Sequence, residues 1–153
     1  MASLHIIYAS TSGHTEHVVD TLIALLAAKG VKIAKQRAEE SAPEDLLKGD
    51  VLLLASGTWN TGGIEGQLNP HMHDFLKIRA KDIDLKKKSV AVIALGDARY
   101  RYTAKAGEHL KEFVEKHHGK ILGDSLKIVN EPYGQEEKIK EWGEVLLPLL
   151  QSI

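Results

Sequence analysis

Short apolar segments alternate with amphipathic segments along the whole chain. Three of the apolar segments carry apolar residues at nearly every position, which is typical of strands covered on both faces of a sheet. Between them, apolar residues recur at helical spacing, which predicts amphipathic helices. The predicted strands are residues 4–9, 31–35, 50–55, 90–95 and 120–129, and the predicted helices are, with approximate ends, residues 13–29, 64–78, 104–118 and 136–150.

This regular alternation indicates an α/β fold built on a doubly wound parallel sheet. The chain has 153 residues with no internal repeat or linker, so we expect a single domain over residues 1–153. In such a sheet a ligand sits outside the carboxyl ends of the strands, near the point where the strand order reverses. The loops that follow the strands are therefore the predicted location of a binding site.

The amino-acid composition excludes several classes of function. The chain has no cysteine, which excludes a disulfide scaffold, thiol catalysis and iron–sulfur ligation. Its 20 Lys and Arg against 21 Asp and Glu give a net charge of −1, so no global field favours nucleic acid or an anionic membrane. No apolar run is long enough to cross a membrane, and residues 4–9 lack the length and basic lead of a signal peptide. We expect a cytoplasmic protein that binds neither nucleic acid nor membrane.

The first loop, residues 10–15, has the chemistry of a phosphate site. It offers hydroxyl groups, and the helix that begins near Gly13 adds free N–H groups and the positive end of its dipole. It has no Lys or Arg, and it matches neither the P-loop pattern nor the dinucleotide fingerprint, which favours a terminal monophosphate. The plainer alternative is that these residues only cap the helix. The hydroxyl groups belong to Ser10, Thr11, Ser12 and Thr15.

The second and third loops carry aromatic residues. Residues 56–63 place Trp59 among small and polar residues directly after a buried strand, and residues 96–102 contain Tyr100 and Tyr102. Aromatic side chains bind flat ligands by offset stacking. Together with the first loop they predict a site for an aromatic ring with a phosphate tail. Trp59 could instead lie in the core, but its glycine-rich neighbours favour an exposed loop.

These three loops, in this order after their strands, resemble those of the flavodoxins. Ser10-Thr-Ser-Gly-His-Thr15 is similar to their phosphate loop for flavin mononucleotide (FMN), Thr58-Trp59 to their first flavin-flanking loop, and Gly96-Asp97 with Tyr100 to their second. The final strand has no long insertion, as in short-chain flavodoxins. The resemblance implies a three-layer fold with five parallel strands in the order 2-1-3-4-5, and one noncovalently bound FMN.

The resemblance also implies a role for each site residue. Gly13 would allow close approach of the backbone to the phosphate. Trp59 and Tyr100 would cover opposite faces of the flavin, and Tyr102 would reach the ribityl chain. The phosphate would be bound by Ser10, Thr11, Ser12, His14 and Thr15, and backbone groups at the polar edge of the flavin would come from Gly57, Thr58, Asn60, Thr61, Leu95, Gly96 and Asp97. We expect no metal site, because His71 and His73 point to different sides of their predicted helix.

The function implied by the resemblance is low-potential single-electron transfer between redox enzymes, by a monomer with transient partners and no enzymatic turnover. One alternative is an FMN-dependent NAD(P)H:quinone-type oxidoreductase, but such relatives have larger loops and a dimer interface over the flavin. Another is a binding domain that has lost its cofactor, which the intact first loop disfavours.

The resemblance also bears on the redox potentials, because full reduction of a flavodoxin flavin makes it anionic. Because Arg99 and Arg101 flank Tyr100 and carboxylates are sparse in the loops, we expect a second potential less negative than in acidic flavodoxins.

Overall fold

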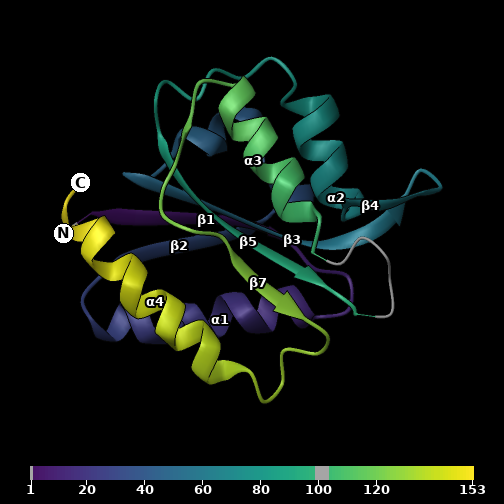
Figure 1. Cartoon of the computed structure of the whole chain (residues 1–153). Helices are drawn as coiled ribbons and strands as arrows, with labels where there is room; N and C mark the ends of the chain where they lie inside the picture. The colour runs from purple at the N-terminus through teal and green to yellow at the C-terminus, as the bar shows by residue number, and fades with distance from the viewer. Residues whose placement is uncertain (1, 99–103) are drawn as a thin grey trace.

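The computed structural model of the chain describes residues 2–98 and 104–153 and shows a parallel sheet between two layers of helices (Figure 1). Its strands are β1 (Ser3–Ala9), β2 (Lys32–Arg37), β3 (Val51–Thr61), β4 (Ile64–Leu68), β5 (Ser89–Gly96), β6 (Lys120–Ile121) and β7 (Leu126–Val129). Its α-helices are α1 (His14–Ala28), α2 (Pro70–His73), α3 (Ala106–Lys116) and α4 (Glu136–Gln151), with 3-10 turns at Ala38–Glu40 and Pro43–Leu47 and a π-helical segment at Asp74–Arg79.

The strand order is β2-β1-β3-β5, followed by β6 and β7, which both pair with β5 in parallel. This confirms the predicted order 2-1-3-4-5, with one difference. The predicted fifth strand, residues 120–129, is two short strands, because the chain turns between them at Gly123 with a φ of +69°. The order reverses between β1 and β3, so the carboxyl ends of these two strands mark the switch point where ligands bind in such sheets.

Alternate residues of the central strands belong to two separate cores, one on each face of the sheet. On β5, for example, Val92 packs in the core under α2 and α3, while Ile93 packs in the core under α1 and α4. Successive side chains of a strand point to opposite faces, so a strand covered on both sides must be apolar throughout. This is the physical reason for the uninterrupted apolar runs in the sequence. Figure 1 shows the two helix pairs on opposite sides of the sheet.

The predicted helix over residues 64–78 is wrong in its first part. Strand β3 continues to Thr61 instead of ending near residue 55, and it turns back into the antiparallel strand β4. Gly62 and Gly63 make the turn with φ of +67° and +79°, and two consecutive positive φ values are what a two-residue hairpin turn needs. The helix begins only at Pro70, because the Asn69 side chain accepts a hydrogen bond from the N–H of His71 at 2.9 Å and caps it.

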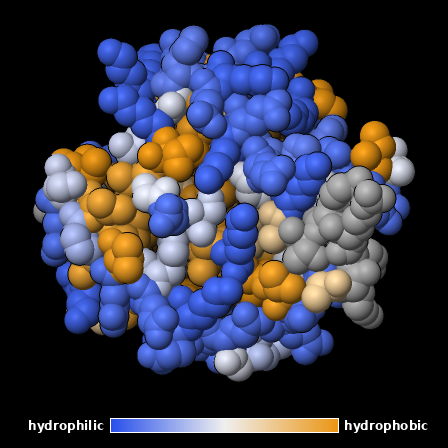
Figure 2. Space-filling model, in the orientation of Figure 1, coloured by the Kyte–Doolittle hydropathy of each residue, from blue (hydrophilic) through white to orange (hydrophobic). Residues whose placement is uncertain are grey.

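Apolar residues are unevenly distributed on the surface (Figure 2). They gather on the left of the view, beside the C-terminal half of α4, where Val145 is 68% exposed, while the upper part around α3 is hydrophilic. Among the described residues, no helix combines the length and the apolar character that a membrane crossing requires.

Candidate functional site

A cavity of about 440 Å³ opens at the carboxyl ends of β1, β3 and β5, between the predicted loops. Its size falls in the range of small-molecule sites, about 300–1,000 Å³. The structure therefore brings together most of the residues that the sequence singled out. The predicted residues that line it are Thr11, Ser12, His14, Thr15, Gly57, Thr58, Trp59, Asn60, Leu95, Gly96 and Asp97.

Ser10 takes a structural role in the first loop. Its hydroxyl oxygen accepts hydrogen bonds from the N–H of Gly13 at 3.1 Å and of Glu16 at 3.3 Å, and the residue is buried. It is thus a helix-capping residue, the plainer alternative considered for this loop, and it does not line the cavity. Gly13 does not line the cavity either, and its φ of +91° turns the chain into α1.

The rest of the first loop presents donors toward the cavity. The Thr11 hydroxyl oxygen accepts a hydrogen bond from Nδ2 of Asn69 at 3.0 Å, which leaves the hydroxyl hydrogen available to an acceptor in the cavity. The N–H groups of His14 and Thr15 are in the first turn of α1, where helix geometry provides no acceptor. Hydroxyl groups and free N–H groups at a helix N-terminus can form an anion site without Lys or Arg.

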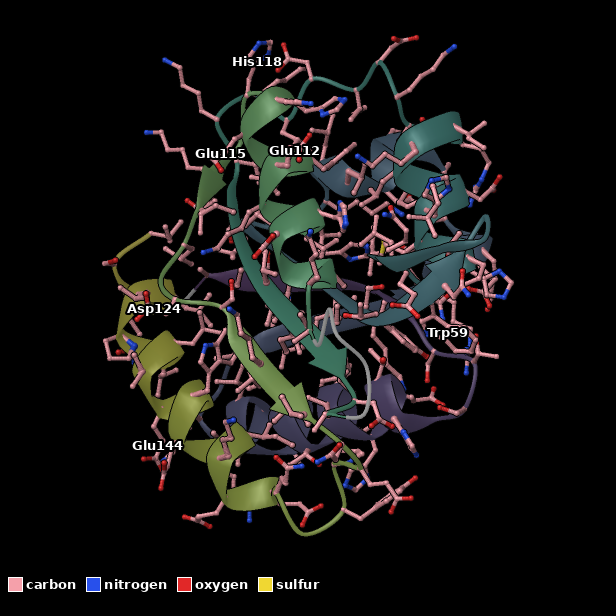
Figure 3. All side chains as sticks on the ribbon, turned by 45° about the vertical axis from the view of Figure 1, so that its right-hand side comes forward. Trp59, Glu112, Glu115, His118, Asp124 and Glu144 are labelled. Atoms are coloured by element: carbon pink, nitrogen blue, oxygen red, sulfur yellow. The ribbon has the colours of Figure 1, made fainter. Side chains whose placement is uncertain are left out.

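The second loop, residues 56–63, consists of the C-terminal part of β3 and the turn of the β3–β4 hairpin. Trp59 is 39% exposed and lies at the hairpin side of the molecule, which excludes the alternative that it is a core residue (Figure 3). A Cβ at Gly57 would lie 3.1 Å from Nε1 of Trp59, so the absence of a side chain at Gly57 allows the indole to approach the strand. Asn60 lines the cavity beside Trp59, whereas Thr61 does not, because its hydroxyl donates to the Leu68 carbonyl.

Thr58 links the second loop to the third. Its hydroxyl donates to the carbonyl oxygen of Leu95 at 2.8 Å and accepts from the N–H of Ala106 at 3.1 Å, so one side chain joins β3, the end of β5 and the start of α3. This fixes the rim of the cavity on which Leu95, Gly96 and Asp97 lie. The aromatic residues predicted for the third loop, Tyr100 and Tyr102, and the arginines Arg99 and Arg101 lie outside the described residues, so their roles stay predictions.

The sequence did not predict five further lining residues. Asn130 follows β7 and closes the cavity rim: its Oδ1 accepts from the N–H of Ala98 at 2.9 Å, and its own N–H donates to the carbonyl of Gly96 at 2.7 Å. The sequence could have predicted Asn130, because it directly follows the last predicted strand, whose carboxyl end lies at the same edge of the sheet. Three others, Glu65, Gly66 and Asn69, were missed because residues 64–78 were predicted to be a helix. The five are Glu65, Gly66, Asn69, Asn130 and Glu131.

The charge around the cavity is negative on the part of the chain that the structure describes. Glu65, Asp97 and Glu131 line it, and within residues 2–98 and 104–153 no Lys or Arg does. On this part of the chain an anionic ligand group would be held by hydroxyl and N–H dipoles, and a ring in the cavity would lie near these three carboxylates. Among the described residues there is no group of three His, Cys, Asp or Glu side chains able to hold a metal ion.

Comparison with known proteins agrees with this arrangement. The chain matches the family model described as Flavodoxin over residues 6–142. It is 31% identical to a flavodoxin of Maridesulfovibrio salexigens over 94% of this chain and 95% of that protein. The solved structure of oxidised flavodoxin 2 from Bacillus cereus is 30% identical and has a TM-score of 0.86, covering 96% of this chain and 99% of that one. A short-chain flavodoxin associated with a PDU bacterial microcompartment shares the fold, with a TM-score of 0.82 at 24% identity over 98% of this chain and 99% of that one.

Proposed function

Since the chain belongs to the flavodoxin family of FMN-binding electron carriers, we propose that the cavity at the carboxyl ends of β1, β3 and β5 is its FMN site. The protein is an electron-transfer protein and not an enzyme, and it is a short-chain member of the family. The site assignment rests on one observation: the donors of the first loop and the partly exposed Trp59 ring line the same cavity.

The residues present fit FMN at both ends of the cofactor. The Thr11, Ser12 and Thr15 hydroxyls, with the N–H groups of His14 and Thr15, supply the donors that a phosphate needs. Trp59 supplies one stacking surface for the isoalloxazine ring, and its exposed part leaves that side of the ring near the surface. On the resemblance, Tyr100 covers the other face and Tyr102 reaches the ribityl chain.

FMN, when bound, supplies the one-electron redox chemistry, and the protein sets its potentials. The chain contributes binding through the first loop, orientation through Trp59, and an anionic surrounding through Glu65, Asp97 and Glu131. Of the described residues, these carboxylates disfavour negative charge on the ring, which supports a low-potential carrier, while the sequence predicts an opposing effect of Arg99 and Arg101. Flavodoxins exchange electrons with redox proteins in transient contacts. That this one acts as a monomer in the cytoplasm is part of our proposal, testable by gel filtration and cell fractionation.

Two measurements on the purified protein test the proposal. In the first, apoprotein is titrated with FMN and with riboflavin, which lacks the phosphate. We expect one FMN per chain and much weaker riboflavin binding. Ser12→Ala and Thr15→Ala should each weaken FMN by about tenfold or more, because a hydrogen bond to a charged group contributes about 1.5–3 kcal/mol. In the second, stepwise anaerobic reduction is followed by visible absorption, and the carrier should take up its electrons one at a time.

Equal affinity for riboflavin and FMN would overturn the assignment of the first loop as the phosphate site. Uptake of both electrons in a single step would contradict a one-electron carrier.

A further inference from the structure

We infer that Arg37, at the end of β2, is a positioning residue for the phosphate-binding loop, although it lies outside the cavity and in a segment that the site does not include. This inference rests on the proposed FMN site. The first loop itself contains no Lys or Arg, and its geometry depends on bonds from neighbouring segments. Arg37 is a basic side chain that bonds directly to the loop backbone, at the Ser10 carbonyl.

The guanidinium of Arg37 bridges the two ends of the loop. Its Nη1 donates to the carbonyl oxygen of Ser10 at 2.9 Å, where the loop leaves β1. Its Nη2 donates to Oε1 of Glu16 at 3.2 Å, in the first turn of α1 where the loop ends. One planar group thus fixes the distance between the start and the end of the loop.

Ser10 is held from two sides as a result. Its carbonyl oxygen accepts from Arg37, while its hydroxyl oxygen accepts from the N–H groups of Gly13 and Glu16. These bonds use the N–H groups of the N-cap residue Gly13 and of Glu16 in the first turn, neither of which lines the cavity. The N–H groups of His14 and Thr15 and the neighbouring hydroxyls are then free to face an anion.

Glu16 is kept charged and in place for this bridge. It accepts from the Tyr8 hydroxyl at 2.6 Å and from Lys35 Nζ at 3.4 Å in addition to Arg37. The Tyr8 hydrogen bond, followed by the Arg37 charge, lowers the pKa of Glu16, while burial and then the bond to Glu16 raise the pKa of Tyr8 to about 12. Arg37 also lies 5.3 Å above the Tyr8 ring centre, so its direction is fixed by stacking as well as by hydrogen bonds.

An arginine is needed for this geometry. The two acceptors, the Ser10 carbonyl and the Glu16 carboxylate, are reached by different nitrogens of one rigid fork. A lysine carries its charge on a single nitrogen and cannot keep both bonds in one fixed orientation. Because the charge of Arg37 is already paired with Glu16, its effect on FMN is to hold the donors and not to attract the phosphate from a distance.

The experiment compares Arg37→Met and Arg37→Lys with the wild type, and titrates each apoprotein with FMN and with riboflavin. We expect Arg37→Met to weaken FMN by about tenfold, the effect of one charge-assisted hydrogen bond, and to leave riboflavin affinity nearly unchanged. The ratio of the two affinities should fall by the same factor. Arg37→Lys should restore part of the ratio, because it retains one bond.

Arg79 provides a matched control. Like Arg37 it donates to backbone, to the carbonyls of Ser41 at 2.6 Å and Ala38 at 2.8 Å, lies above an aromatic ring, 4.9 Å from the centre of Phe75, and does not line the cavity, but these bonds do not reach the first loop. Arg79→Met should lower stability in urea and leave the FMN-to-riboflavin ratio unchanged.

The inference is overturned if Arg37→Met weakens both ligands equally, or if Arg79→Met changes the ratio as much, because the role would then be general stability. Equal binding of the two ligands by the wild type would instead overturn the proposed phosphate site. The two failures are therefore distinguishable.

Discussion

The side-chain amide of Asn69 donates a hydrogen bond of 3.0 Å to the hydroxyl oxygen of Thr11, across 58 positions of sequence. Asn69 is 1% exposed and makes three more hydrogen bonds: its N–H donates to Ser56 Oγ at 3.1 Å, its Oδ1 accepts from the N–H of His71, and its carbonyl oxygen accepts from the N–H of His73 at 2.8 Å. It therefore caps α2 and joins the first loop to the hairpin. Because the Asn69 amide nitrogen is the donor in this bond, the Thr11 hydroxyl hydrogen must point to another acceptor. Thr11 lines the cavity, so a phosphate bound there could be that acceptor.

Asn69→Asp reverses the polarity of this bond. A carboxylate preserves the cap on α2 but accepts from Thr11, so it withdraws the hydroxyl hydrogen from the phosphate and adds a negative charge nearby. We expect FMN affinity to fall by more than about tenfold, with riboflavin much less affected. Thr11→Val is the control: in a Thr11→Val background, which already lacks the hydroxyl, Asn69→Asp should weaken FMN by less than it does in the wild type. An Asn69→Asp variant that binds FMN like the wild type would show that Thr11 makes no bond to the phosphate.

Trp59 should report cofactor binding directly. We expect FMN to quench its fluorescence strongly, and Trp59→Ala to weaken binding by about 1–3 kcal/mol, because a stacked aromatic ring buries a large apolar area. Trp142 is the internal reference. It packs against the core between α1 and α4, and its Nε1 donates to the Asp124 carbonyl at 2.9 Å. The quenching should therefore vanish in Trp59→Phe and persist in Trp142→Phe. If FMN did not change the Trp59 fluorescence, Trp59 would not be part of the FMN site.

The sequence was sufficient for the order of the parallel strands and for the location of the first loop at the carboxyl end of β1, because both depend on local patterns. Apolar runs follow from coverage on both faces, and the hydroxyl-rich turn before a helix is visible by itself. The hairpin was missed for a physical reason. Ile64 and Leu68 stand four apart, which fits one face of a helix, and only the Gly62-Gly63 pair signalled a turn between strands.

Contacts between distant segments were beyond the reach of sequence patterns. Ser10 offers the same hydroxyl chemistry as Thr11, and only the structure separates them: one caps α1, while the other is oriented by Asn69. Likewise nothing local distinguishes Arg37 from Lys35 as the partner of the Ser10 carbonyl. Such roles depend on which strands are neighbours and which way each side chain faces, and those follow from the assembled fold.

Acid should weaken the fold through Asp45. Its carboxylate accepts from Lys48 at 2.8 Å, from the Ala42 N–H at 2.8 Å and from Gln36 at 2.9 Å, and these bonds, Lys48 first, lower its pKa from 3.8 to about 2. A depressed carboxyl pKa adds stability above the unfolded-state pKa, and that contribution is lost as the pH falls from about 4 to about 2. Asp45→Asn should therefore cost about 1–2 kcal/mol near pH 7 and progressively less below about pH 4.

Urea unfolding of the apoprotein at several pH values measures this difference. Asp74→Asn is a suitable control, since Asp74 pairs with Arg79 at an exposed position, with a carboxylate side chain 56% accessible. A penalty for Asp45→Asn that is the same near pH 2.5 and near pH 7 would show that the ionised carboxylate is not its source.

The arginines of the third loop carry a prediction that rests on the sequence, since Arg99 and Arg101 lie outside the described residues. Their positive charges should stabilise the anionic, fully reduced flavin. Arg99→Glu and Arg101→Glu should each make the second potential more negative by some tens of millivolts, because a solvated charge contributes less than the ~2 kcal/mol expected at ~8 Å. Potentiometry at low salt tests this. No shift in either variant would point to solvent-facing arginines available for docking a partner.

The carboxylates around the cavity should act in the opposite direction, and the structure makes this effect larger than the sequence implied. From the sequence, only Asp97 of these three carboxylates was assigned to the site, whereas Glu65 and Glu131 also line the cavity. Each negative charge disfavours the anionic ring, so Glu65→Gln and Glu131→Gln should each raise the second potential. A net interaction of ~1 kcal/mol corresponds to about 40 mV for one electron, and salt should reduce the shift. Glu144→Gln is the matched control, because it removes the same charge from α4, on the side of the molecule away from Trp59 (Figure 3). If Glu131→Gln and Glu144→Gln shift the potential equally, the effect reflects net charge alone, and the carboxylates at the cavity have no special influence on the flavin.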